Sequence, residues 1–351
     1  AMQNQSVKIT PLLDTLHLEK IDDSIYFSKK YSNYISNSRL SLINPEQDGS
    51  PEKFFSGFKS VYSPSFELGS AIHELTLQNS LFTLAPDLEK PSAKMGALAD
   101  RLYKYYLDHK VPTFEEISKE AEVIDYYGGK LSDNKIQNVY DKCSNYWHNR
   151  ERFEAQYVGD SEIIYLDSRS REIVSNCVLA LKNNSKIQEL LNPKGFIKDP
   201  ISEMEQAILL DVLVEMPNGH KFILKLKAKL DNYTIDKENN IVTVNDVKTI
   251  GKIVSEMQGN IDRYHYNREF AVYAYLLCRC AEKFYNMDNF KVQGNYLIVS
   301  TIPQHYTKVI TLNKSMYQEG FKEFQYLIRL VAEAVDTEYK ELKRFRKIAD
   351  E

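Results

Sequence analysis

The sequence has few cysteines, four in 351 residues, and no two of them have the C-x-x-C spacing of metal or redox sites. This argues against a zinc or iron–sulfur site and suits reduced thiols. Long apolar runs are absent too: none approaches the roughly 18 residues that cross a bilayer, and the amino terminus lacks the basic-then-apolar pattern of a secretion signal. We therefore expect a cytoplasmic protein without membrane contact.

Strong charge is also lacking, because the formal net charge is only −4 at pH 7. A chain with so small a charge has no overall attraction to nucleic acid, so any contact with DNA would need a local basic face. Internal repeats and low-complexity tracts are absent as well. What the sequence does contain is 43% apolar residues, enough for one large α/β domain or two domains.

Two neighbouring stretches predict strands that carry charged groups. Residues 221–230 alternate between apolar and mostly lysine side chains, and Asp231 follows on the lysine face. Residues 241–248 are rich in β-branched side chains and follow a polar turn. Because side chains two apart on a strand point the same way, Asp246 and Lys248 share a face. We therefore expect two carboxylates and one ammonium group to converge at neighbouring strand ends.

The rest of the chain predicts helices around these strands. Helical and period-two patterns, together with Gly, Pro and Asn-Gly turn signals, define the expected elements. In order they are a loop-rich lead-in over 3–65, a helix over 66–78, a mostly helical region over 80–195, strands over 208–214, 221–230 and 241–248, a helix over 263–284, strands over 295–301 and 307–312, and a helix over 314–348. The predicted fold class is α/β, a mixed central sheet flanked by helices with a helical insertion.

His73 lies beside the apolar stripe of the helix over 66–78. A helical side chain leans over the residue four positions earlier, which here is Gly69 and has no side chain. The imidazole is therefore expected to be accessible to a metal ion or a phosphate. The alternative is a structural histidine without a ligand.

The two aspartates suit a hard divalent cation, because magnesium takes one or two protein carboxylates and keeps water and substrate phosphates as its other ligands. Asp231 and Asp246 supply that minimum, and His73 would make manganese equally acceptable. A bound metal ion acidifies water and offsets charge on a phosphodiester, while Lys248 would orient the water or neutralise the phosphate. The alternative is solvated charges or a surface ion pair, worth about 0–1 kcal/mol. Asp-x-Lys occurs three times, but only the copy at Asp246 lies on a predicted strand.

Several separated motifs accompany this set. They read Ser36-Asn-Ser38-Arg-Leu40, Ser50-Pro51-Glu-Lys-Phe54, Gly69-Ser-Ala-Ile-His73, Glu205 ahead of the first core strand, Lys229-Leu-Asp231 and Asn245-Asp246-Val-Lys248-Thr249. Together they resemble the PD-(D/E)XK nuclease superfamily, and within it the RecB-like exonucleases, most closely the exonuclease VIII-like proteins of phage recombination systems. The resemblance covers residues 33–80 and 203–275.

The resemblance implies roles for five residues. His73, Asp231 and Asp246 would bind Mg²⁺ or Mn²⁺, and Lys248 would be the catalytic lysine. Glu205 resembles the glutamate that often opens the first core strand, so we add it to the catalytic set.

The resemblance also implies a restriction-endonuclease-like organisation. Residues 3–80 would form the N-terminal part of the nuclease domain with the histidine helix, 81–200 a helical insertion, and 201–351 the core sheet and C-terminal helices. Members of this group commonly form rings that thread DNA, which implies a homo-oligomer. A single-strand annealing protein is a further candidate partner, and the cytoplasm would be that of a bacterium or a phage-infected host cell.

Candidate DNA contacts lie on the second predicted strand and on the helix over 263–284. On this helix the family often has Gln-x-x-x-Tyr, whereas the chain has Glu269-x-x-x-Tyr273, which puts negative charge where DNA or metal would approach. The expected contacts are Lys225, Lys227 and Lys229 on the strand and Asn267, Arg268 and Tyr273 on the helix. The alternative for both groups is an exposed, solvated face.

The predicted function is a metal-dependent DNA nuclease that hydrolyses phosphodiester bonds, specifically an exonuclease that processes double-stranded ends in recombination or repair. Two alternatives stay open. One is a nuclease fold that has lost catalysis and binds DNA or protein, as an accessory or anti-defence protein would. The other is an endonuclease for single strands or flaps, which shares the site and differs in access.

Overall fold

The chain divides into two compact units, each with its own hydrophobic core. The computed structural model describes residues 7–57, 63–337 and 346–347. The sheet unit comprises residues 1–59, 184–299 and 306–351, and the helical unit comprises residues 60–183 and 300–305.

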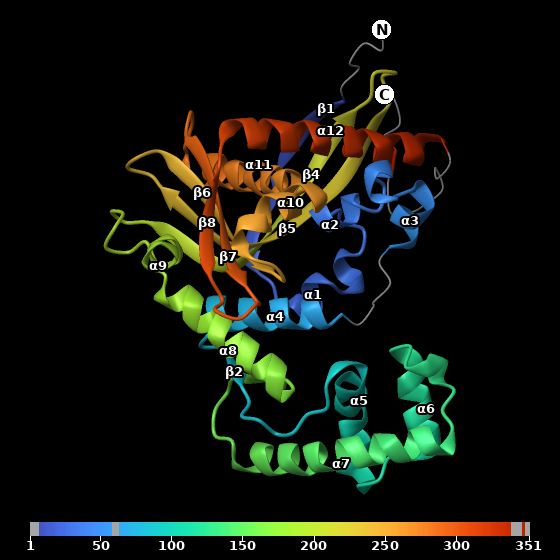
Figure 1. Ribbon diagram of the computed structural model, residues 1–351. Coiled ribbons are helices and arrows are strands. Elements are labelled where there is room, and N and C mark those ends of the chain that lie inside the picture. The colour runs from blue at the N-terminus through green and yellow to red at the C-terminus, as the bar shows by residue number, and fades with distance from the viewer. Residues whose placement is uncertain (1–6, 58–62, 338–345, 348–351) are drawn as a thin grey trace. The chain divides into compact units, whose positions relative to one another are not determined.

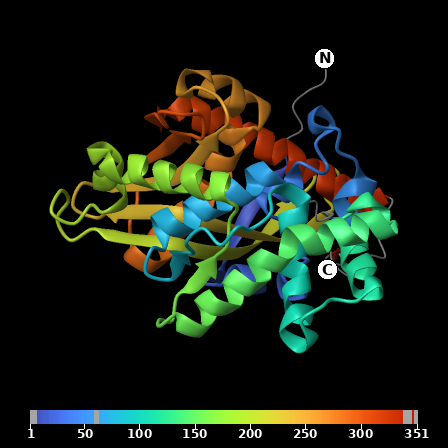
Figure 2. The same cartoon turned by 60° about the horizontal axis from the view of Figure 1, so that its bottom comes forward.

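The sheet unit is organised around a mixed central sheet in the order β1-β4-β5-β6-β7-β8, and β9 pairs with β5 outside this path (Figure 1). The strands are β1 (Lys8–Lys20), β4 (Ile201–Glu215), β5 (Lys221–Asp236), β6 (Ile241–Ile250), β7 (Lys291–Ser300), β8 (Thr307–Leu312) and β9 (Arg346–Lys347). β4, β5 and β6 are consecutive antiparallel neighbours, so the predicted meander is confirmed. Figure 2 shows the long strands β4 and β5, in yellow-green and yellow, side by side.

β5 continues past its predicted end at residue 230 and runs to Asp236. Its second half pairs with β6, and the Tyr233 and Ile235 side chains there enter the main core. Before Asp231 the core side chains of β5 are at even positions, and after it they are at odd positions. Because of this one-residue shift, the second half of β5 does not continue the alternation of residues 221–230 and could not be predicted from it. Asp231 and Asp246 lie inside their strands, so the prediction that they meet at strand ends was wrong.

Two long helices, α11 (Tyr266–Tyr285) and α12 (Lys314–Thr337), pack against each other over the sheet (Figure 1). Gly320 of α12 allows a close approach, because a Cβ atom there would lie 2.0 Å from the Asn267 carbonyl oxygen of α11. Both helices were predicted. Residues 338–345 of the helix expected over 314–348 lie outside the described residues, and Arg346–Lys347 form β9 instead of its end.

Shorter elements complete the sheet unit. They are α1 (Asp23–Tyr26), η1 (Lys29–Tyr31), α2 (Asn37–Leu40), η2 (Pro45–Gln47), α3 (Pro51–Ser56), α9 (Ser185–Leu191), η4 (Val254–Glu256) and α10 (Met257–Arg263).

β1 corrects the prediction of a loop-rich lead-in. This strand lies at the sheet edge beside β4, and its register shifts between Leu12 and His17. It contains Pro11, which cannot donate to a ladder but is tolerated on an edge strand. The proline and the irregular register broke the alternation that would have identified the strand.

A ladder of side-chain hydrogen bonds crosses the sheet from β8 to β4. The Thr311 hydroxyl donates to Asn295 Oδ1 (2.9 Å), and Asn295 Nδ2 donates to Asn245 Oδ1 (3.0 Å). Asn245 Nδ2 donates to Asn232 Oδ1 (2.8 Å), and Asn232 Nδ2 donates to Ser202 Oγ (3.2 Å). All three asparagines are buried, so a slipped register would leave amides without partners. The ladder therefore fixes the alignment of the central strands.

The helical unit is built from helices and one short parallel strand pair. Its elements are α4 (Pro64–Leu77), β2 (Phe82–Leu84), α5 (Ala93–His109), α6 (Phe114–Val123), η3 (Tyr127–Gly129), α7 (Asp133–Gln156), β3 (Glu162–Ile164) and α8 (Ser168–Asn183). The helices α5, α6 and α7 pack together around Trp147, whose Nε1 donates to the Ala99 carbonyl (2.9 Å) (Figures 1 and 2). None of the helices in the described part of the chain is long and apolar enough to span a bilayer.

Candidate active site

Three acidic residues form a row across β4, β5 and β6. The strand registers place Glu205 opposite Asp231, and continuing the next register by one pair places Asp231 opposite Asp246. Carboxylate oxygens of Glu205 and Asp231 lie within 4.8 Å of each other. The sequence placed Glu205 just ahead of the first core strand, whereas it lies inside β4. The sheet thus brings three of the predicted site residues together.

The backbone is distorted at the start of this row. Glu205 has a φ angle of 54°, in the left-handed region that non-glycine residues avoid, and the ladder between β4 and β5 is interrupted there. The side-chain alternation of β5 shifts at Asp231, directly opposite. Distortions of this kind re-aim side chains and are concentrated at functional sites. Because glutamate has no preference for this conformation, the distortion could not be predicted from the sequence.

Asp231 and Asp246 are buried, with exposed fractions of 8% and 5%. Asp231 Oδ2 accepts a hydrogen bond from the Val247 amide (2.8 Å). Asp246 Oδ2 has no well-directed hydrogen bond, although it lies 2.7 Å from Lys248 Nζ as an ion pair. Burial, and after it the charge of Asp231, raises the pKa of Asp246 well above its usual range. A cation beside both carboxylates would reverse this effect.

The residues fit a hard divalent cation. Carboxylate oxygens are the donors that Mg²⁺ and Mn²⁺ prefer, and one or two protein carboxylates suffice when water and phosphate complete the shell. A buried carboxylate oxygen without a directed hydrogen bond, as in Asp246, is a donor that such an ion would satisfy.

Lys248 is held between two carboxylates. Its Nζ lies 2.7 Å from Asp246 Oδ2 and 2.7 Å from Glu269 Oε1 on α11. The same nitrogen lies 4.5 Å from the centre of the Tyr266 ring and 5.8 Å from that of Tyr296. Burial acts to lower the pKa of Lys248, but the charges of Asp246 and Glu269 raise it well above its usual value. The side chain is therefore fixed as a cation next to Asp246.

The sequence identified Glu269 only as a departure from the family pattern, and the structure gives it a partner in Lys248. Tyr273, one turn further along α11, has a pKa raised by burial and then by the charge of Glu269, so it lies near this pair. Tyr266 and Tyr296 were missed, because a chain with 24 tyrosines offers no reason to select two of them.

The three lysines of β5 have intramolecular partners. Lys225 pairs with Asp211 (3.1 Å), and Lys227 is buried with its Nζ donating to the Tyr26 carbonyl (2.7 Å). Lys229 Nζ donates to the Ile21 carbonyl (2.7 Å) and pairs with Asp23 (2.6 Å). The contacts of Lys227 and Lys229 hold the segment around α1 against the sheet. They make the lysine row a packing surface in this structure, in contrast to the basic strip expected along a DNA path.

Arg268 also departs from the expected DNA contact. Its side chain is completely buried and donates to Asn37 Oδ1 (2.9 Å), Gln47 Oε1 (2.9 Å) and Glu323 Oε1 (2.9 Å). A guanidinium enclosed in this way ties α11 to α2, η2 and α12, and it has no surface to offer a phosphate. The neighbouring Asn267 is half-buried.

His73 lies on α4 and therefore belongs to the helical unit, whereas the three acidic residues belong to the sheet unit. The helix starts after Ser63, which caps it, and its buried face includes Ile72. The neighbouring His73 is half-buried. The predicted helix is present, and the role of His73 as a metal ligand stays a prediction.

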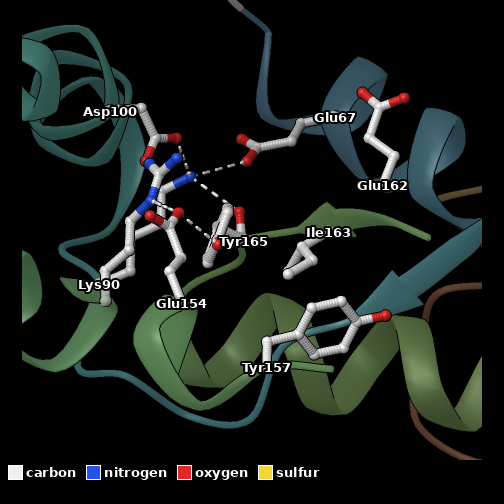
Figure 3. Close-up of a pocket in the computed structure, with 9 residues that line it drawn as sticks. Glu67, Lys90, Asp100, Glu154, Tyr157, Glu162, Ile163 and Tyr165 are labelled. Atoms are coloured by element: carbon white, nitrogen blue, oxygen red, sulfur yellow. Dashed lines mark hydrogen bonds and ion pairs between the residues drawn. The ribbon is translucent and has the colours of Figure 1, made fainter. Parts of the chain in front are cut away.

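The helical unit has a polar pocket of about 600 Å³ of its own (Figure 3). Lys90 lies between Glu67 (3.4 Å) and Asp100 (2.7 Å), and Arg150 pairs with Asp100 (3.1 Å) and Glu154 (3.0 Å). Four carboxylates and only two cations line the pocket. Both cations are neutralised, so the pocket is unsuited to bind a phosphate backbone.

Comparison with known proteins leaves the family open. No protein-family model matches the chain, and no curated protein matches it. One similar solved structure is the crystal structure of a protein described as "Putative exonuclease" from Eubacterium rectale. The match has 10% sequence identity and a TM-score of 0.42, and it covers 90% of this chain and 87% of that chain.

Proposed function

We propose that the chain is a metal-dependent DNA nuclease of the PD-(D/E)XK type with a restriction-endonuclease-like core. The observation that carries the proposal is the buried Asp246 carboxylate, aligned with Asp231 and Glu205 across three strands and 2.7 Å from Lys248 Nζ. A lone surface ion pair would lack the two further carboxylates and the burial. The substrate we propose is a double-stranded DNA end, processed exonucleolytically in recombination or repair.

Each residue then has a defined task. Asp231 and Asp246 would hold Mg²⁺ or Mn²⁺, with Glu205 beside them and His73 as a further ligand from α4. A bound ion would supply an acidified water and neutralise charge on the phosphate. Lys248 would contact the phosphate oxygens as a fixed cation, since an oriented positive charge stabilises charge that develops during the displacement. Glu269 would keep that lysine in place.

The test uses linear and circular DNAs labelled at either end, with Mg²⁺ or Mn²⁺. We expect the linear DNAs to be degraded from an end and the circles to persist. Asp246→Ala and Lys248→Ala should lower the rate by about 10²–10³-fold, the usual effect of removing one electrostatic stabiliser. Lys291→Ala, an exposed lysine at the start of β7, is the matched control. Intact linear DNA with both metals, or full activity in Lys248→Ala, would contradict the proposal.

A catalytically inactive binding module is the second candidate, because Lys248 is neutralised by two carboxylates instead of one. Such a module would bind DNA or protein and leave both linear and circular DNA intact. An endonuclease for single strands or flaps would instead cut circular single strands. A homo-oligomeric ring and an annealing-protein partner remain predictions from the family resemblance.

A further inference from the structure

The exposed Tyr264 is connected to Lys248 through one intervening ring, that of Tyr266. Tyr264 follows α10 and is 48% exposed, and its ring stacks on that of Tyr266 with centroids 5.9 Å apart and planes at 28°. Tyr266 in turn lies 4.5 Å from Lys248 Nζ and packs on Tyr296 at 5.4 Å. A column of rings therefore leads from solvent to the lysine. The two inner rings lie beside the lysine, and about half of the outer tyrosine is exposed to solvent.

The turn that presents Tyr264 is rigidly held. His265, between the two stacked tyrosines, has a left-handed backbone with φ of 54° and ψ of 45°. Such a conformation persists in a non-glycine residue only where surrounding contacts enforce it. Here the His265 Nδ1 lies 2.7 Å from Glu323 Oε1, and the same carboxylate oxygen accepts from Arg268. The strained residue places the two rings on one side of the chain and keeps them stacked.

A positive charge lies beside the exposed ring. Arg263, the last residue of α10, is exposed, and its guanidinium lies 5.5 Å from the centre of the Tyr264 ring. An aromatic face next to an arginine is the combination that binds a nucleobase and its adjoining phosphate in single-strand recognition. Stacking of this kind tolerates every base, because each base has a π-face.

We propose that Tyr264 is a stacking platform for the nucleobase beside the scissile phosphate, with Arg263 on the neighbouring phosphate. The inference rests on the proposed nuclease function and adds to it a contact that selects an unpaired nucleotide without reading its sequence. A duplex end would have to open by at least one base pair to use the platform. A terminal mismatch should therefore speed the reaction of the parent protein.

The kinetic test compares Tyr264→Ala with Tyr264→Phe. Loss of the ring should raise KM for DNA on the order of tenfold and leave kcat nearly unchanged, because stacking holds the bound substrate before and during the reaction. The phenylalanine keeps the ring and should restore the parent KM. Tyr326→Ala removes an equally exposed tyrosine (49%) on α12 and should behave as the parent does. An unchanged KM in Tyr264→Ala would overturn the proposal.

A binding test without metal separates this inference from hydrolysis. The probe is DNA with 2-aminopurine at the terminal nucleotide, and a matching DNA has an abasic site there. The parent should quench the fluorescence and lose affinity for the abasic DNA, whereas Tyr264→Ala should do neither. If the parent degrades DNA but the abasic site weakens DNA binding equally in the parent and in Tyr264→Ala, the platform is overturned and the nuclease function stands. If the parent degrades nothing, the nuclease function fails, and the quenching alone supports or overturns the platform.

Discussion

At the level of single residues, the site is defined by how Lys248 is neutralised. Asp246 and Glu269 both contact its ammonium, so the group of three carries one net negative charge. A glutamine at residue 269, the residue frequent in the resembling family, would make the same group neutral. Burial and the charge of Asp231 raise the pKa of Asp246, and the charge of Glu269 adds to this shift. Burial acts to lower the pKa of Lys248, but the charges of Asp246 and Glu269 raise it.

Glu269→Ala should lower kcat by about 10–100-fold with little change in KM, because the lysine loses the partner that positions it. Glu269→Gln should stay close to the parent, since the amide oxygen still accepts from Lys248. Initial rates on linear DNA at saturating Mn²⁺ would measure both. Glu282→Ala removes an ion pair with Arg279 on the same helix and is the control. Parent-like activity in Glu269→Ala would show that Glu269 does not position the lysine.

Lys227 predicts a pH dependence of stability. Burial, and after it the charge of Arg39, lowers the pKa of Lys227 from 10.5 to about 8. Between these values the unfolded chain binds more protons than the folded protein, so this residue makes the free energy of unfolding rise with pH. Urea denaturation from pH 7 to 10.5 should show the parent gaining stability relative to Lys227→Met. Lys225→Met keeps Lys227, so this variant should gain stability with pH as the parent does. If the difference in the free energy of unfolding between the parent and Lys227→Met shrinks or stays constant as the pH rises, the lowered pKa of Lys227 is refuted.

At the level of secondary-structure elements, the regular parts of the chain could be predicted and the irregular ones could not. The first half of β5 and the helix α11 follow a clean period of two or 3.6 residues, and β6 is rich in β-branched side chains. β1 and the second half of β5 break that period, one with a proline and a register shift and the other with the reversal at Asp231. The second break coincides with the acidic row, because the reversal lies at Asp231.

The side-chain ladder makes a prediction about the central strands. Asn245→Val removes its middle member and leaves buried groups of Asn232 and Asn295 without partners, each costing about 1–3 kcal/mol. We expect the free energy of unfolding to fall by about 2–4 kcal/mol in urea with an unchanged m-value. Thr243→Val, at a buried residue two positions earlier on β6, should cost less than Asn245→Val, because the Thr243 hydroxyl is not a member of the ladder. Equal losses of unfolding free energy in Asn245→Val and Thr243→Val would show that the ladder adds no stability of its own.

At the level of the whole molecule, the candidate site residues are divided between the two units in the sequence. The sheet unit holds Glu205, Asp231 and Asp246, and the helical unit holds His73. Sequence motifs selected the aspartates, the lysine and the histidine as candidates, and the fold places Asp231, Asp246 and Lys248 close together. Their roles stay predictions. They could not predict which cations are free, since partners such as Asp211 for Lys225 are set by the tertiary fold. The net charge of −4 also leaves DNA attraction to local groups.

The central claim is that the acidic row binds a divalent metal ion, and calorimetric titration with Mn²⁺ tests it most directly. The parent should bind Mn²⁺, and Asp231→Asn and Asp246→Asn should each bind it at least about tenfold more weakly, since both remove a ligand charge. Asp211→Asn, on the neighbouring strand and paired with Lys225, should bind as the parent does. No binding to the parent, or equal affinity in all four proteins, would contradict the account.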